Sequence, residues 1–311
     1  MSFDLATLTE AVALHGRVAR VVVADIAGST PREVGATMLV WPGGQSGTIG
    51  GGTLEFQAAE RALTQEGLSR HALGPELGQC CGGAVTLLTE QFDAARLASL
   101  TNDVIARGAG SRPLAVQRII DRARAQGITP KPRLVQGWMI EPVLKPENEL
   151  WIWGAGHVGR ALVDVLAPLK RFAITWVDTG PERFPDTLPS DVTALPAQNP
   201  ALLMAHAPTL AAHLILTYSH ELDFQLCHGA LQRGFTFAGL IGSDTKWARF
   251  QNRLRKLGHT HEEIQGITCP IGQKELGKQP HAIAIGVAAQ LLSHDFKGAT
   301  VCPTLCSASE A

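Results

Sequence analysis

The first half of the chain alternates between short apolar runs and glycine-rich segments. Apolar residues recur at helical spacing over residues 5–14, and a run rich in β-branched residues over 18–26 predicts a buried strand. Further strands are predicted at 36–41 and, more briefly, at 46–49, where three glycines follow. A helix should come next over residues 53–65, with its first residue, a threonine, as the N-cap.

The rest of the first half is less regular and ends in a candidate domain boundary. Residues 84–89 predict a strand and residues 93–107 a helix, so we expect a mixed α/β domain. Residues 142–149 contain two prolines and a cluster of charges, a composition typical of a linker. We therefore expect two domains, at about 1–148 and 149–311.

Strands and helices alternate more regularly in the second half. The predicted strands cover residues 150–153, 172–177, 213–217 and 235–241. The predicted helices cover residues 158–169, a segment that ends near 231, and 245–257. Alternation at this pitch indicates a parallel sheet with right-handed crossovers. We predict an α/β protein with a Rossmann-like, doubly wound sheet in its second domain.

A glycine fingerprint follows the first strand of that sheet. Gly154, Gly156 and Gly159 fit the pattern G-x-G-x-x-G between an apolar strand and an amphipathic helix. Such a turn lets a phosphate approach the backbone at the helix N-terminus. Asp178 ends the next strand, 19 residues after Gly159, and could accept hydrogen bonds from a ribose diol. The alternative is a tight strand-to-helix turn that binds nothing.

Three more polar residues are candidates near the carboxyl end of this sheet, where doubly wound folds bind ligands. His157 either faces a ligand or is a partly exposed residue in the first turn of a helix. His220 and Asp223 lie where a strand gives way to a helix, and they either bind a ligand or cap that helix.

Two adjacent cysteines form the most unusual motif in the chain. Gln79, Cys80 and Cys81 are flanked by glycines and precede a strand. A cysteine there offers a nucleophilic thiolate or a ligand for a soft metal. The chain has no C-x-x-C zinc pattern, and its other four cysteines are scattered. A functional thiol site, with Cys80 and Cys81 as possible metal ligands, competes with a simply packed pair.

Two further glycine-rich loops of the first half could converge on this motif. One supplies the hydroxyl of Ser29 and the guanidinium of Arg32, both suited to an anion. The other contains Gly50, Gly51 and Gly52, which resemble an anion-binding nest that leads into a helix. Either loop could also be a plain turn.

Composition excludes several classes of function. The chain has 311 residues, of which 45% are hydrophobic and 18% charged, so a disordered protein is excluded. The formal charge is -1, which argues against a general electrostatic grip on nucleic acid or anionic lipid. We find no apolar run of the ~20 residues needed to cross a bilayer and no signal peptide, so we expect a cytoplasmic protein with reduced thiols.

In combination, these motifs resemble the XdhC family, the maturation factors for xanthine dehydrogenase related to the CoxI proteins. The resemblance covers about residues 18–292. The matching segments are residues 28–36, 47–52 with 54–55, 78–83, 154–159, 220–223, 239–243 and 269–272.

The resemblance implies an accessory protein rather than an enzyme. Members bind the molybdopterin form of the molybdenum cofactor, hold it while a partner cysteine desulfurase exchanges an oxo ligand for sulfur, and deliver it to apo-xanthine dehydrogenase. Proteins of molybdenum cofactor biosynthesis are further expected partners, and a homodimer is possible. Cys80 or Cys81 would contact molybdenum, and a helix N-terminus near Gly50 or Gly156 would hold the phosphate.

Two other functions stay open. The fingerprint and Asp178 alone would suit an NAD(P)-dependent oxidoreductase, which leaves the cysteine pair unexplained. A sulfurtransferase would instead carry a persulfide on Cys80 or Cys81 as a covalent intermediate. The chaperone function requires no separate nucleotide.

Overall fold

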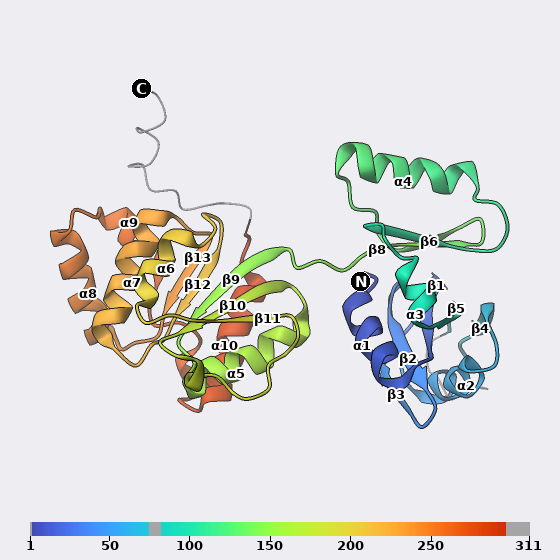
Figure 1. The fold of residues 1–311 in the computed structure, drawn as a ribbon, viewed down its shortest axis with the longest axis horizontal. Helices are drawn as coiled ribbons and strands as arrows, with labels where there is room; N and C mark the ends of the chain where they lie inside the picture. The colour runs from blue at the N-terminus through green and yellow to red at the C-terminus, as the bar shows by residue number, and fades with distance from the viewer. Residues whose placement is uncertain (1, 75–81, 297–311) are drawn as a thin grey trace. The chain divides into compact units, whose positions relative to one another are not determined.

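The structure is a computed structural model that describes residues 2–74 and 82–296 (Figure 1). The chain divides into two compact units, Met1–Leu144 and Lys145–Ala311. Each unit has its own apolar core, and each is described by itself below. No described helix has both the length and the apolar character needed to span a membrane.

The N-terminal unit is built on a five-stranded antiparallel sheet of order β3-β2-β1-β5-β4. Its strands are β1 (Val18–Ala27), β2 (Thr37–Trp41), β3 (Gly44–Gly47), β4 (Gly67–Ala72) and β5 (Ala84–Phe92). One face packs on helix α2 (Gly52–Ala62), because alternate residues such as Val21 and Val23 meet Leu54 and Ala58. Helices α1 (Leu5–His15) and α3 (Ala94–Ala98) border a separate apolar cluster around Phe3 and Phe92.

A second, smaller sheet completes this unit. It has the order β6-β8-β7, with β6 (Val104–Arg107), β7 (Arg133–Val135) and β8 (Trp138–Pro142). Helix α4 (Leu114–Gln126) covers it by burying Val116 and Ile120 against Trp138 and Ile140.

Three predictions for this unit were wrong. The helix predicted over residues 93–107 is the short α3 followed by strand β6, because the polar segment after Ser99 ends the helix and Val104–Arg107 pairs with β8. Thr53 is not an N-cap, since Gly51 holds that position and α2 already begins at Gly52. The strand predicted at 46–49 is β3, shifted toward the N-terminus because it pairs with β2 across a tight turn.

The C-terminal unit is a six-stranded parallel sheet of order β11-β10-β9-β12-β13-β14. Its strands are β9 (Asn148–Trp153), β10 (Phe172–Asp178), β11 (Val192–Pro196), β12 (Ala212–Ile215), β13 (Phe237–Leu240) and β14 (Ile267–Thr268). Strand order reverses between β9 and β12, which is the arrangement of a doubly wound dinucleotide-binding fold. The predicted fold class is confirmed.

Helices cover both faces of this sheet (Figure 1). Leu150 and Ile152 of β9 pack in the cluster of α5 (His157–Leu166) and α10 (Pro280–Ser293). Trp151 and Trp153 point the other way, into the cluster of α7 (His220–Arg233) and α8 (Asp244–Lys256). The short helices α6 (Pro200–Leu203) and α9 (His261–Gln265) complete the unit.

Candidate functional site

Close backbone contacts bring the glycine-rich loops of the N-terminal unit together. A Cβ atom on Gly83 would lie 2.3 Å from the carbonyl oxygen of Ser29, and one on Gly50 would lie 2.6 Å from Cγ of Pro31. Only glycine fits at either position, so the loop that carries Ser29 packs against both Gly50 and Gly83. Gln79, Cys80 and Cys81, the predicted thiol motif, lie outside the described residues; Gly83 is the second described residue after them.

The nest formed by Gly50 and its neighbours already has an anion, the carboxylate of Glu55. Its Oε2 atom accepts hydrogen bonds from Thr48 Oγ1 at 2.6 Å, from Ile49 N at 2.9 Å and from Gly51 N at 3.0 Å. Burial raises the pKa of Glu55, but these donors outweigh burial and hold the pKa below its usual value. An incoming phosphate would therefore compete with Glu55 for the same N–H groups.

The two side chains predicted to attract an anion differ in how they are held. Ser29 is exposed, and it lies in the loop that contacts Gly83. Arg32 donates to the carbonyl oxygen of Thr48 at 3.3 Å and lies 3.5 Å from the carboxylate of Glu33. The guanidinium thus ties the Ser29 loop to the Gly50 loop, with its charge partly offset by Glu33.

The fingerprint loop of the C-terminal unit is tightly packed. A Cβ atom on Gly159 would lie 2.1 Å from the carbonyl oxygen of Gly154, so the first turn of α5 can approach the loop only through a glycine. The same oxygen accepts a hydrogen bond from Trp176 Nε1 at 3.0 Å. Gly156 and His157 are exposed at the start of α5.

Asp178 points into this loop and is only 5% exposed. Its Oδ2 atom accepts from Ala155 N at 2.6 Å, and its Oδ1 atom accepts from Thr179 N at 2.6 Å. Arg183 Nε lies 3.5 Å from Oδ1. The carboxylate therefore holds the glycine loop to the end of β10, and a ribose diol would have to reach a group that is almost fully buried.

His220 and Asp223 do not act as a pair. His220 is the exposed first residue of α7, whereas Asp223 is completely buried. Asp223 accepts from Thr217 N at 2.9 Å and pairs with Lys246 Nζ at 2.5 Å. Ser219 is the residue whose side chain caps the helix.

Lys246 and Cys269 were not among the candidates from the sequence. Lys246 is 11% exposed and also donates to the carbonyl oxygen of Ile241. A Cβ atom on Gly242 would lie 3.6 Å from Sγ of Cys269, which places this thiol at the same sheet edge. Burial raises the pKa of Cys269 to about 11, so its sulfur is a thiol at neutral pH. The one signal in the sequence that could have pointed to this pair was a lysine in the first turn of α8.

The described residues contain no group of three or more His, Cys, Asp or Glu side chains arranged to hold a metal ion. Cys227 is fully buried, and burial raises its pKa well above the usual value. The two cysteines predicted as metal ligands, Cys80 and Cys81, lie outside the segments described.

Two family models match the chain. Residues 150–291 match the XdhC Rossmann domain, and residues 11–71 match the XdhC and CoxI family. The chain belongs to the XdhC family. The XdhC and CoxI family model covers the Ser29 and Gly50 loops, and the XdhC Rossmann domain model covers the Gly154 loop.

Similar proteins are distant in sequence. The chain is 24% identical over 287 residues to PaoD of Escherichia coli, which is named a molybdenum cofactor insertion chaperone. The aligned region covers 88% of this chain and 82% of PaoD. It is 25% identical over 280 residues to the uncharacterized protein YqeB of the same organism. That aligned region covers 87% of this chain but only 42% of YqeB.

A crystal structure from Bacillus halodurans, described as a xanthine dehydrogenase, has a similar fold. The match has a TM-score of 0.66 at 19% identity and covers 93% of this chain and 95% of that one. At this identity the likeness concerns the fold.

Proposed function

We propose that this XdhC-family protein is a chaperone that binds the molybdenum cofactor, holds it while sulfur replaces an oxo ligand, and delivers it to apo-xanthine dehydrogenase. The name of the relative PaoD, an insertion chaperone, supports a role in handling this cofactor. The protein acts as an accessory factor in the cytoplasm, and the cofactor is its cargo.

One observation carries the proposal: the contact of Gly83 with the carbonyl oxygens of Ala27 and Ser29. It fixes the chain two residues beyond Cys81 against the loop that presents Ser29 and Arg32. A cargo with a thiophilic metal, a phosphate and a hydrogen-bonding ring system needs a soft ligand, a cation and polar groups close together. The three loops contain these residue types, and Gly83 anchors the chain that follows the cysteines.

We assign the parts of the cargo to residues of these loops. Cys80 or Cys81 contacts molybdenum, with Gln79 beside them, and Ser29, Arg32 and backbone groups near Gly50 bind the polar parts. The phosphate lies either there or at the exposed N-terminus of α5, at Gly156 and His157. The partners are a cysteine desulfurase, apo-xanthine dehydrogenase and the proteins that synthesise the cofactor.

The deciding experiment is an anaerobic titration of the purified full-length protein with molybdenum cofactor, beside NADH on the same sample. We expect saturable binding of the cofactor and no response to NADH, because both oxygens of Asp178 accept bonds from the protein. Binding of NADH without binding of the cofactor would overturn the proposal in favour of an oxidoreductase.

Single cysteine variants then test the thiol assignment. Cys80→Ala and Cys81→Ala are compared with Cys269→Ala, which removes a thiol from the other unit. We expect at least one of the first two to weaken cofactor binding tenfold or more, with Cys269→Ala unchanged; ten-fold corresponds to about 1.4 kcal/mol. Equal affinity in all three would exclude a thiol ligand. A mass increase of about one sulfur atom after exposure to a desulfurase would instead indicate a persulfide carrier.

A further inference from the structure

A cavity of about 680 Å³ lies within the N-terminal unit, and no described residue of the glycine-rich loops lines it. Its wall comes from the ends of β4 and β5 on one side, and from β6, β8 and α4 on the other. A volume of this size is typical of sites for small organic ligands. None of the candidate residues that the structure describes lines it.

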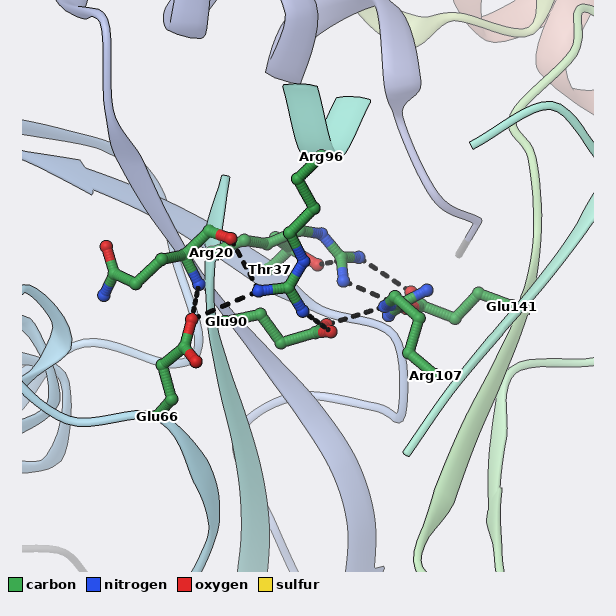
Figure 2. A network of polar contacts seen from close by, with 8 residues as sticks. Arg20, Thr37, Glu66, Glu90, Arg96, Arg107 and Glu141 are labelled. Carbon is green, nitrogen blue, oxygen red and sulfur yellow. Dashed lines mark hydrogen bonds and ion pairs between the residues drawn. The ribbon is translucent and has the colours of Figure 1, made fainter. Parts of the chain in front are cut away.

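Ion pairs join the two sheets (Figure 2), and two of their members, Glu90 and Arg107, line the cavity. Arg20 of β1 pairs with Glu141 of β8 at 2.7 Å, and Arg107 of β6 pairs with Glu90 of β5 at 2.7 Å as well as with Glu141. Arg96 extends the network to Glu90 at 3.0 Å. These ion pairs hold the walls of the cavity in place, because moving either sheet would leave a charged side chain buried without its partner.

The cavity nevertheless carries positive charge, because Arg112 and Arg124 line it and lie outside this balanced network of three arginines and three glutamates. Four arginines and two glutamates line it, an excess of two positive charges: Arg96, Arg107, Arg112 and Arg124 against Glu66 and Glu90. Arg107 is 8% exposed, and its Nη1 atom is buried with no hydrogen-bond partner among the described residues. An unpartnered donor on a buried guanidinium is costly unless a ligand or water satisfies it.

Two of these arginines lie at the surface and donate to neutral groups. Arg112 donates to the amide oxygen of Gln117 at 3.2 Å, and Arg124 donates to that of Asn102 at 2.7 Å. Neutral amides orient a guanidinium without cancelling its charge, so both arginines can still attract an anion.

Much of the remaining wall is apolar, although Thr89, Ser99 and Asn102 also line it. Leu68, Leu88, Leu100 and Ile120 contribute aliphatic surface, and Trp138 contributes an indole ring. The guanidinium of Arg112 lies 5.7 Å from the centre of that ring, so cation and aromatic face share one side of the cavity. Such a mixture suits a molecule with an anionic head and an apolar body.

We propose that this cavity binds an organic anion, a phosphate monoester or a carboxylate attached to an apolar ring. The head lies against Arg112 with Arg107 at the wall, and the ring packs on Trp138 and the leucines. Arg124 lies near the other end of α4, roughly 18 Å away along the helix, and attracts the anion only at a distance. The described residues of the glycine-rich loops do not line this site, and it does not depend on the function proposed above.

Calorimetric titration of the full-length protein with phenyl phosphate and with benzoate tests the site. Inorganic phosphate and benzyl alcohol serve as the head alone and the apolar body alone. We expect saturable binding of phenyl phosphate, of benzoate or of both, at least tenfold tighter than either fragment. Binding of neither anion, or binding no tighter than that of the fragments, would overturn the proposal.

Arginine variants then locate the binding. Arg112→Gln should weaken binding of the tighter-binding anion at least fivefold, and Arg124→Gln should weaken it less, without changing the melting temperature, since both side chains are exposed. Arg118→Gln and Arg122→Gln are the matched controls, because both are exposed on the same helix α4 and do not line the cavity. Equal weakening by both pairs would mean a general charge effect, and no weakening by the first pair would place the anion elsewhere; either result overturns the assignment.

Discussion

The Gly50 loop and the Gly154 loop both direct backbone N–H groups at a carboxylate of the protein itself, but they hold it differently. Glu55 reaches back from the first turn of the helix that the Gly50 loop begins, and it is only partly buried. Asp178 reaches across from a neighbouring strand, and it is 5% exposed. The Gly50 loop can exchange the Glu55 carboxylate for another anion, whereas the Gly154 loop is closed around the Asp178 carboxylate.

This difference changes how a glycine-rich loop should be interpreted. The pattern predicts a backbone that can bind an anion, and both loops have that backbone. Whether an external anion can enter depends on how strongly the internal carboxylate is retained. Perturbing the packing, the carboxylates and the pH in turn tests this contrast.

The largest effect should come from breaking the packing that closes the Gly154 loop. Gly159→Ala places a methyl group 2.1 Å from the carbonyl oxygen of Gly154, so α5 must move away from the loop. We expect a loss of about 3 kcal/mol in the free energy of unfolding, the upper end for overpacking. Urea denaturation of the full-length protein measures it.

Gly156→Ala is the control for this substitution. A Cβ atom there would meet no atom within 4 Å, and the residue has a φ of -73°, which alanine adopts readily. Its effect should stay within about 0.5 kcal/mol. If Gly159→Ala lost as little stability as Gly156→Ala, the loop would tolerate displacement, and the Asp178 carboxylate would not be closed in.

The next largest effect on stability should come from removing each carboxylate, and it should differ between the two loops. Asp178→Ala leaves a buried N–H group on Ala155 and a partly buried one on Thr179 without this acceptor, and we expect a loss of about 2–3 kcal/mol. Glu55→Ala should cost about 1 kcal/mol, because water can reach the donors that it exposes. Thermal or urea unfolding compares the two variants, and an equal cost would refute the difference in closure.

Much of this contrast could not be predicted from the sequence. The β-branched run of β1 and the strand-turn-helix pattern at Gly154 predicted the local backbone, because both depend on neighbouring residues. The partner of Ala155 N depends on how β10 lies beside β9, and a sequence pattern does not contain that register. Glu55 left a usable signal, since an acidic residue in the first helical turn competes for the donors of a nest.

The smaller sheet of the N-terminal unit was missed for a related reason. Its strands have three to five residues, too few to show a period. Arg20 in the middle of an apolar run was a hint, but its partner Glu141 is 121 residues away. The arginine-lined cavity forms only where these distant segments meet, so it was not among the sequence predictions.

A smaller effect concerns binding of anions. Glu55→Ala removes the carboxylate that accepts hydrogen bonds in this loop, and inorganic phosphate should then take its place with a dissociation constant of about 1 mM. Asp178→Ala should gain no such binding, because Ala155 is 2% exposed and its N–H stays inaccessible. Phosphorus NMR line broadening measures both. Phosphate binding by the Asp178 variant would reverse the assignment of open and closed loops.

The pH dependence of stability gives the smallest predicted effect and the most direct test of Glu55. Its pKa in the folded protein lies below the usual 4.5, because the donors of the loop favour the charged form more than burial opposes it. The unfolded chain therefore binds the proton more tightly, and stability from this group is present above pH 4.5 and is lost as the pH falls through the lower folded pKa. The stability difference between the wild type and Glu55→Gln should thus shrink between about pH 6 and about pH 3.

Glu60→Gln, which removes one negative charge from the same helix, corrects for the change in net charge. A corrected difference that stays constant over this range would mean that the nest does not hold the Glu55 carboxylate, and the Gly50 loop would then be as free for an external phosphate as its sequence suggests.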